Sequence, residues 1–310
     1  SDDRMKNIVA TIQREQNKII RNDTSNTLII QGVAGSGKTS IALHRVAYLL
    51  YRHKGEITSN DILIISPNKV FADYISNVLP ELGEEKIEEC GFEELMLKIL
   101  DNKYKIQTFF DQVAEILDKE EEDFIERIRF KSTTEFIQQM DKYILYLEQN
   151  AFRPTDLKAG RIPIPAEYLK ERFAAWHRLP MRSRFQPMAE EIARELTFTY
   201  HQEPMGKIQI RQLGNELKKM FNNKDLDLYK GFYDWLGKPE MFKQGKNRKL
   251  EYADVAPLLY LKLALEDNKT MYGIKHLLVE KCRTILRYNT KFWLNYSLAG
   301  KQYWEMQSNQ

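Results

Sequence analysis

The sequence predicts an α/β fold in which a parallel β-sheet is interrupted by a large, mostly helical insertion. Residues 27–66 contain the pattern strand, glycine-rich loop, helix and strand, which implies a parallel sheet covered by helices. Between residues 93 and 249, long charged stretches carry apolar residues at helical spacing. The expected domains are 1–92 as the first part of the α/β domain, 93–249 as the insertion, 250–280 as the return to the α/β domain, and 281–310 as a tail.

Individual elements follow from spacing and from turn residues. The expected elements of the α/β domain are a helix at 3–21, a strand at 27–31, a helix at 38–52, a strand at 61–66, a helix at 252–265 and a strand at 274–279. Three prolines and a glycine at 153–165 indicate a loop or short hairpin inside the insertion. Arg178, Arg182 and Arg184 form a small basic cluster there, which we interpret as a solvated helix start rather than a nucleic-acid patch.

Composition limits the class of protein. A chain of 310 residues with 43% hydrophobic residues can bury a substantial core. No apolar run approaches the roughly 20 residues of a membrane span, and Cys90 and Cys282 make neither a disulfide framework nor a metal cluster. We therefore expect a cytoplasmic protein with no membrane partner and no indicated oligomeric state. The net charge of +3 does not by itself indicate nucleic-acid binding, so such a partner must be argued from a site.

The segment that carries chemistry is the glycine-rich loop. It reads Gly32-Val33-Ala34-Gly35-Ser36-Gly37-Lys38-Thr39 and fits the pattern G-x-x-x-x-G-K-[ST]. The glycines let successive backbone N–H groups face one anion-sized hollow, and the following helix adds positive partial charge. We expect Lys38 to reach the β- and γ-phosphates of a nucleoside triphosphate, and the hydroxyl of Thr39 to ligate Mg²⁺. Because the loop follows a strand and opens a helix, the sequence predicts a P-loop NTPase sheet.

Gln16 lies on the expected helix just before this strand. Its amide can both donate and accept hydrogen bonds, as recognition of an adenine edge requires. Taken alone, a glutamine here is more simply a surface residue. Its position upstream of the loop makes it a candidate for binding the base.

These features together resemble the UvrD/Rep-like superfamily 1 helicases. The resemblance rests on Gln16, on the AGSGKT loop and on the helix sequence HRVAYLL at 44–50. It implies an incomplete RecA-like motor domain that binds ATP and Mg²⁺ and acts on nucleic acid, usually DNA, and it implies that Gln16 selects adenine. The segment ILIISPNKVFAD at 62–73 resembles the family's next motif, whose loop contacts single-stranded nucleic acid. Asn68 and Lys69 are therefore candidate contacts, although the family's DNA helicases usually show threonine and phenylalanine there, and a strand-to-helix cap is the alternative.

A closer resemblance is to the HelD-type branch, whose members act on bacterial RNA polymerase. The segments ATIQREQNKIIR, QGVAGSGKTSIALHRVAYLLY, SPNKVFADYISNVLPELGE and APLLYLKLALE carry it, together with the large helical insertion. This resemblance implies RNA polymerase as a partner. It also implies a coiled-coil arm before this region and a second motor domain after it in the longer protein.

The tail departs from the family pattern. After the strand at 274–279 the family shows an Asp-Glu pair, in which the Asp holds Mg²⁺ and the Glu polarises the attacking water. Here the chain reads Val279-Glu280-Lys281-Cys282. If one T is added after the GA of a Glu280 codon, the reading frame shifts. With suitably chosen codons, the sequence from Val279 onward then reads VDEMQDYSPVQYQVL, and residues 301–307 can read TILGDA. We therefore expect residues 281–310 to be the product of a one-base deletion that need not pack or function, with an ordinary surface helix as the alternative.

The sequence predicts an ATP-binding fragment of a superfamily 1 helicase-like motor ATPase in which hydrolysis is impaired. An unrelated P-loop kinase or small NTPase is one alternative, but it would need an acidic metal ligand after its second strand, where this chain has Ser66 and Pro67. A non-enzymatic module that binds RNA polymerase through the insertion is the other.

Overall fold

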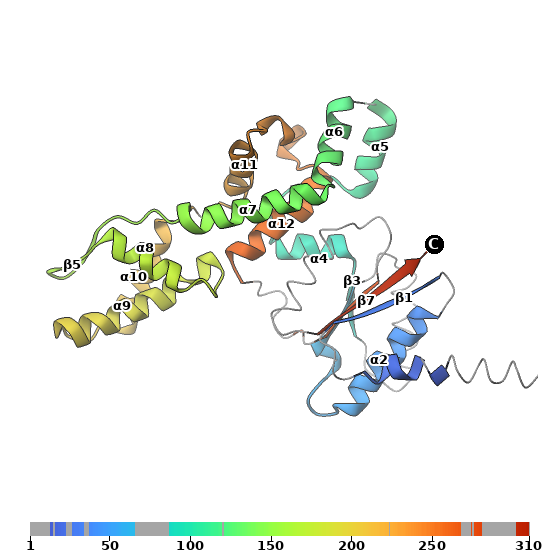
Figure 1. Ribbon diagram of the computed structural model, residues 1–310, viewed down its shortest axis with the longest axis horizontal. Coiled ribbons are helices and arrows are strands. Elements are labelled where there is room, and N and C mark those ends of the chain that lie inside the picture. The colour runs from blue at the N-terminus through green and yellow to red at the C-terminus, as the bar shows by residue number, and fades with distance from the viewer. Residues whose placement is uncertain are drawn as a thin grey trace, which may run out of the picture. The chain divides into compact units, whose positions relative to one another are not determined.

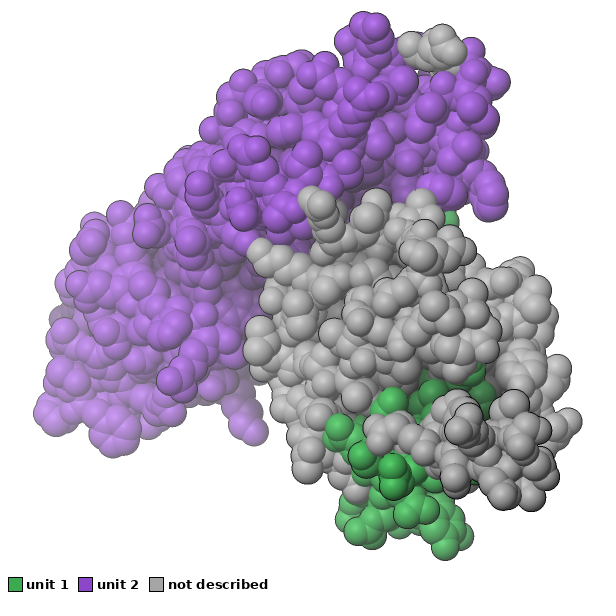
Figure 2. All heavy atoms as spheres, turned by 45° about the vertical axis from the view of Figure 1, so that its right-hand side comes forward, with its two compact units in different colours: residues 1–99, 270–310 green, residues 100–269 purple. Residues whose placement is uncertain are grey.

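The described part of the chain forms two compact units. The computed structural model describes residues 13–14, 16–22, 27–33, 37–65, 87–119, 121–222, 224–267, 274, 276–280 and 302–309 (Figure 1). Unit 1 comprises residues 1–99 and 270–310, and unit 2 comprises residues 100–269 (Figure 2). Each unit is described by itself below.

Unit 1 is built on a sheet of five described strands. They are β1 (Thr27–Val33), β2 (Ile62–Ile65), β3 (Glu88–Cys90), β6 (His276–Glu280) and β7 (Gln302–Asn309), in the spatial order β1-β7-β6-β2-β3. Every neighbouring pair in this order runs parallel. The carboxyl ends of these strands therefore lie along one edge of the sheet, the edge at which open parallel sheets bind ligands.

Helix α2 (Lys38–Arg52) supplies much of the core of this unit. Its buried residues Ile41, Val46 and Leu49 pack with Ile62 and Ile64 of β2. All four residues of β2 are buried, as expected of a strand covered on both faces. The bounds of α2 agree with the helix predicted from the sequence. Unit 1 also contains α4 (Phe92–Ile99) and a short helical segment at residues 16–20.

The tail differs from expectation. Gln302–Asn309 form β7, which pairs with β1 on one side and with β6 on the other. The alternative of a surface helix is therefore wrong for residues 302–309, whereas the one-base deletion stays a prediction. Residues 281–301 lie outside the described part of the chain.

Unit 2 is mainly helical. Its larger elements are α5 (Phe109–Lys119), α6 (Glu122–Lys131), α7 (Thr134–Asn150), α8 (Ala166–Ala175), α9 (Phe185–Tyr200), α10 (Lys207–Lys219), α11 (Asp225–Leu236) and α12 (Tyr252–Leu265). The predicted turn region at 153–165 contains the hairpin of β4 (Leu157–Ala159) and β5 (Ile162–Ile164), which pair antiparallel. None of the described helices is long and apolar enough to cross a membrane.

The boundary of the insertion also differs from expectation. Helix α12 has the predicted bounds, but it belongs to unit 2, where it packs against α6, α7 and α11 (Figure 1). At the other end, α4 belongs to unit 1. The cause is that α12 is apolar around most of its circumference, with Val255, Leu258, Leu259 and Leu261 all buried. A helix of this kind would be buried equally well in the α/β domain or in the insertion, so its hydrophobic pattern does not show which elements it packs against.

A network of buried charges joins three helices of unit 2. Arg127 of α6 donates from Nε and Nη2 to Oε1 of Glu251 at 2.8 and 2.6 Å. Lys131 lies 3.2 Å from Glu251 Oε2 and 2.7 Å from Oδ1 of Asp254 on α12. Tyr229 of α11 donates its hydroxyl to the same Asp254 oxygen at 2.6 Å. Burial raises the pKa of Asp254, while the Lys131 ammonium opposes that shift.

The basic cluster of the insertion is structural. Arg184 is 1% exposed and donates from Nη1 and Nη2 to Glu148 at 2.6 and 2.7 Å, and Arg182 is buried against Asp225. Arg178 is exposed. The prediction of a solvated helix start is therefore wrong for Arg182 and Arg184, because each is buried and pairs with a carboxylate distant in the sequence.

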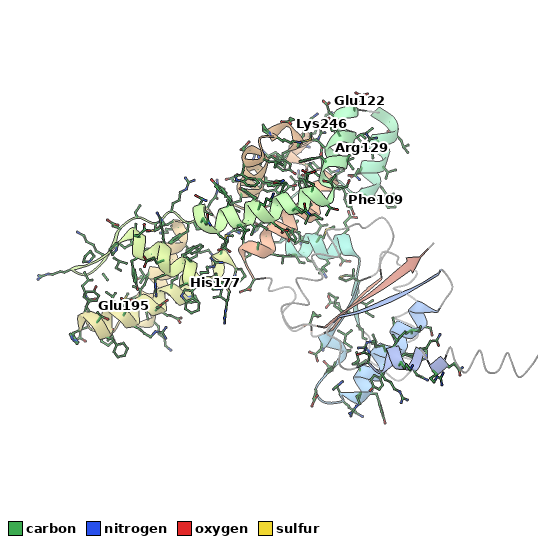
Figure 3. The ribbon with its side chains drawn as sticks, viewed as in Figure 1. Phe109, Glu122, Arg129, His177, Glu195 and Lys246 are labelled. Carbon is green, nitrogen blue, oxygen red and sulfur yellow. The ribbon has the colours of Figure 1, made fainter. Side chains whose placement is uncertain are left out.

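We expect Lys131→Met to destabilise the protein by about 3–5 kcal/mol, because it leaves two carboxylates buried around one remaining cation. Urea unfolding followed by far-ultraviolet circular dichroism would measure the loss. Arg129→Met is the matched control, because Arg129 is exposed on the same helix (labelled in Figure 3) and should change stability by less than about 0.5 kcal/mol.

The raised pKa of Asp254 adds a pH dependence to this prediction. A carboxyl group whose pKa is raised in the folded state loses stabilisation as pH rises through that pKa. Removing Lys131 raises that pKa further, so the deficit should be larger at pH 8 than at pH 5. An equal effect of the two substitutions at both pH values would contradict the role assigned to the network.

Candidate functional site

The connection between β1 and α2 forms the centre of the candidate site. β1 ends at Val33 and α2 begins at Lys38, and Gly37 is the described residue of the connection between them. Gly37 lies in the left-handed region at φ 78° and ψ 15°, which strains any residue that has a Cβ. The third glycine of the motif is therefore required by the backbone.

The start of α2 has the properties of an anion site. Its first described intrahelical bond runs from the Ile41 N–H to the Gly37 carbonyl at 3.0 Å. The N–H groups of Lys38, Thr39 and Ser40 come before that bond and have no acceptor within the helix. No acidic residue occupies the first turn, so the partial positive charge there is not neutralised by the helix itself. These residues fit a bound phosphate group.

Gln16 lies beside this helix start. It is half-buried on the helical segment 16–20, and its Nε2 atom lies 4.0 Å from the position that a Cβ on Gly37 would occupy. The structure therefore brings together the amide of Gln16 and the last residue of the glycine-rich turn, which the sequence predicted separately.

Arg45 fastens the Gln16 segment to α2. It is 1% exposed, and its Nη1 donates to the carbonyls of Ile19 and Ile20 at 3.0 and 3.1 Å. Its Nη2 donates to the carbonyl of Asn22 at 2.6 Å. The last carbonyls of a helix lack an N–H donor within the helix and must accept hydrogen bonds from elsewhere. The helix dipole also favours a cation at this end. The guanidinium thus serves as the C-terminal cap of the helix that carries Gln16.

The role of Arg45 was not predicted, although the sequence contains a signal for it. Ile41, Arg45 and Leu49 are four residues apart, and residues at this spacing share one face of a helix. All three are buried in the structure. A charged residue on an otherwise apolar helical face requires polar partners, so its position alone indicates a specific contact.

The end of β6 lies at the same edge of the sheet as the glycine-rich turn. Glu280, the last residue of β6, pairs with Met306 of β7, and Met306 pairs with Ile30 of β1. Glu280 is therefore level with a residue three positions before Val33, where β1 ends. Backbone register thus places the only acidic residue of β6 beside the middle of β1 and not beside its end.

The remaining predicted site residues fall into two groups. Gly32 and Val33 end β1, and Lys38 and Thr39 open α2. The others, Ala34, Gly35, Ser36, Asn68 and Lys69, lie outside the described residues. Within the described ranges, no group of three or more His, Cys, Asp or Glu side chains could hold a metal ion.

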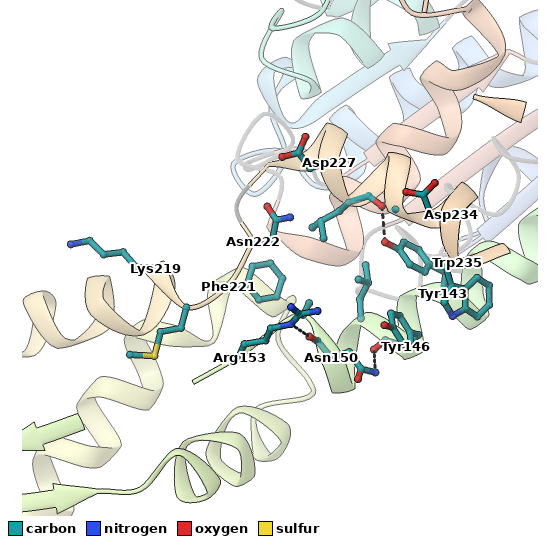
Figure 4. Close-up of a pocket in the computed structure, with 15 residues that line it drawn as sticks. Tyr143, Tyr146, Asn150, Arg153, Lys219, Phe221, Asn222, Asp227, Asp234 and Trp235 are labelled. Carbon is teal, nitrogen blue, oxygen red and sulfur yellow. Dashed lines mark hydrogen bonds between the residues drawn. The ribbon is translucent and has the colours of Figure 1, made fainter. Parts of the chain in front are cut away.

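Unit 2 contains a separate cavity of about 570 Å³ between α7 and α11 (Figure 4). Two partly exposed aromatic residues line it, Tyr146 at 40% and Trp235 at 38%, with ring centroids 6.1 Å apart. Tyr143 forms the floor and donates its hydroxyl to the Leu228 carbonyl at 2.7 Å. Burial raises the pKa of Tyr143, so its hydroxyl stays protonated at neutral pH. The cavity thus combines the aromatic rings of Tyr146 and Trp235 with charged side chains, which include those of Lys219 and Asp227.

Comparison with known protein families identifies one match. The family described as UvrD/REP helicase N-terminal domain matches residues 12–278. This range includes Gln16, the glycine-rich loop, the insertion and most of β6. Comparison with curated proteins gives no match. Because the matched range covers most of the sequence, the chain belongs to the UvrD/REP helicase N-terminal domain family of superfamily 1.

Proposed function

We propose that this chain is the ATP-binding part of a helicase-like motor ATPase and that it binds Mg²⁺-ATP at the start of α2. The family uses ATP and Mg²⁺ and binds nucleic acid. The observation that carries the proposal for this chain is the left-handed Gly37 at the N-terminus of α2, with the Gln16 amide beside it.

Each part of the site has a distinct role in this proposal. The backbone N–H groups that open α2 bind phosphate oxygens, and Lys38 pairs with the β- and γ-phosphates. Thr39 ligates Mg²⁺, which neutralises charge on the phosphates when it is bound. Gln16 hydrogen-bonds the edge of the adenine base.

Hydrolysis requires an acidic metal ligand and a group that orients water, and this chain lacks the expected pair. Glu280 ends β6, but the next residue is Lys281, whose positive charge would oppose a metal ion. We propose that one base is missing within the codon of Glu280, so that the tail is out of frame.

The composition of β7 supports this reading. A strand between two parallel neighbours is usually a run of apolar residues, as in the ILII of β2. β7 instead reads QYWEMQSN, with polar residues on both faces. In the restored frame, the start of this strand can read Thr-Ile-Leu, and these residues suit a strand with a parallel neighbour on each side.

Nucleic acid and bacterial RNA polymerase are the proposed partners of the intact protein. Nucleic-acid binding is a property of the family, and Asn68 and Lys69 are the candidate contacts in this chain. RNA polymerase follows from the HelD-type resemblance, and DNA from the wider family.

We expect Lys38→Ala to weaken binding of Mg²⁺-ATP at least tenfold, about 1.4 kcal/mol, because a charge-assisted contact to the phosphates is lost. Isothermal titration calorimetry would measure both affinities. Lys54→Ala, at an exposed position after α2, is the control and should bind ATP as the parent chain does. Equal affinity in the parent chain and in Lys38→Ala would exclude this loop as the nucleotide site.

We expect ATP hydrolysis by the chain as written to stay near background, with no stimulation by single-stranded nucleic acid. Phosphate release measured with and without nucleic acid would check this. Inserting one T within the Glu280 codon, in the full-length gene, should restore the acidic motif and with it turnover. Robust turnover by the present chain that Lys38→Ala abolishes would contradict both the impaired site and the out-of-frame tail.

A second candidate function is binding of RNA polymerase by unit 2 without a contribution from nucleotide. The cavity beside Tyr146 and Trp235 favours it, because partly exposed aromatic residues around a pocket are typical anchors of protein interfaces.

For this candidate we expect Trp235→Ala to weaken binding to immobilised RNA polymerase core enzyme at least tenfold, while Lys38→Ala has no effect. Phe198→Ala is the matched control, because Phe198 is 77% exposed on α9 and does not line the cavity. Equal binding by all three variants would remove the cavity as the contact, and loss in Lys38→Ala would instead indicate a nucleotide-dependent interaction.

A further inference from the structure

We propose that Arg45 is a positioning residue that determines selectivity for adenine over guanine by holding the Gln16 segment in place. The inference rests on the proposed function, in which Gln16 binds the base. Arg45 itself lies far along α2 from the phosphate end and acts through the segment it caps.

The first step is that Arg45 fixes the end of the Gln16 segment. Its two terminal nitrogens contact the carbonyls of Ile19, Ile20 and Asn22 within 3.1 Å. Three acceptors on successive parts of a helix end restrain both rotation of the segment about its axis and sliding along α2. Apolar contacts alone, such as those of Ile19 and Ile20 with the core, allow both movements more readily.

The second step is that this restraint reaches Gln16. Gln16 and Ile20 are four residues apart and therefore lie on the same face of the segment. Rotation or sliding at Ile20 moves the Gln16 amide by a similar amount. That amide lies 4.0 Å from the Cβ position of Gly37, so its place relative to the phosphate end of α2 is set by the same restraint.

The third step connects position to selectivity. An amide recognises adenine by donating and accepting at the same time, and hydrogen bonds weaken steeply outside a narrow range of distance and angle. A displaced amide still contacts a base but no longer distinguishes adenine from guanine. Binding of the triphosphate depends on the loop and on Lys38, and is retained.

The guanidinium is well suited to this role, and lysine is not. A planar fork with several donors can contact three carbonyls at once, whereas an ammonium is a point charge on a flexible chain. Arg45→Lys keeps the buried positive charge and removes the fork. The surrounding core residues Ile41, Val46 and Leu49 are unchanged, so the fold is expected to persist.

The experiment measures affinities for ATP, GTP and inorganic tripolyphosphate by calorimetry in the full chain. The variants are Gln16→Ala, Arg45→Lys, the double variant, and Arg52→Lys as a control at an exposed position of the same helix. We expect the parent chain and Arg52→Lys to prefer ATP at least tenfold. Gln16→Ala and Arg45→Lys should each reduce that preference to less than threefold, and the double variant should resemble Gln16→Ala alone. Tripolyphosphate affinity should be the same in all of them.

Several results would overturn the proposal. If Arg45→Lys keeps the preference that Gln16→Ala loses, Arg45 does not position the base contact, and the proposed function stands. If Arg45→Lys weakens ATP, GTP and tripolyphosphate alike, its role is general stability of the unit. A preference that survives Gln16→Ala removes the base contact and the Arg45 role together, whereas failure of the parent chain to bind any of the three ligands contradicts the proposed function itself.

A second variant keeps the test informative if Arg45→Lys does not fold, as judged by circular dichroism. Arg45→Gln has a neutral planar amide that can cap one carbonyl, and the proposal expects it to lose the ATP preference with tripolyphosphate affinity retained. A retained preference in this variant would overturn the proposal in the same way.

Discussion

The proposed nucleotide site depends on the backbone at one position, the left-handed Gly37 through which the chain enters α2 after β1. This conformation lets the N–H groups of the first turn of α2 face outward together, and that turn itself contains no acidic residue. Parallel pairing places the turn at the carboxyl edge of the sheet, the same edge at which β6 ends in Glu280. In the proposed function, backbone groups therefore define most of the phosphate site, and specificity for the base comes from the side chain of Gln16.

The two units differ in how they satisfy their buried cations. In unit 1, Arg45 caps the segment that carries Gln16, so a buried cation is satisfied by backbone carbonyls. In unit 2, Arg127 and Lys131 are satisfied by carboxylates of α12 and its N-terminal neighbour. Buried ion pairs of this kind add little net stability but are costly to break. Each unit thus has its own polar anchor, which is consistent with a motor domain that carries an insertion with a separate core.

The local pattern of the sequence predicted more than its long-range contacts. Local structure depends on residues that are adjacent in the chain. The bounds of α2 and a loop or short hairpin at 153–165 were therefore predicted from the sequence. The burial of Arg182 and Arg184 was missed, because their partners Asp225 and Glu148 lie 43 and 36 residues away and periodicity does not reveal such pairs. β7 was missed because its polar composition does not resemble a central strand. For the site, the position of Gln16 in the sequence predicts its role, which stays a prediction, while the contacts of Arg45 with residues 19–22 required the folded structure.

The most direct test of this account is hydrogen–deuterium exchange of the chain with and without saturating Mg²⁺-ATP. Nucleotide bound at the start of α2 should slow exchange of the backbone amides of residues 37–41, where N–H groups contact phosphate, and of residues 16–22, which carry the base contact. Exchange in α11, whose amides belong to unit 2, should not change. Protection confined to unit 2, or no protection at a saturating nucleotide concentration, would contradict the central claim that the turn between β1 and α2 is the ATP site.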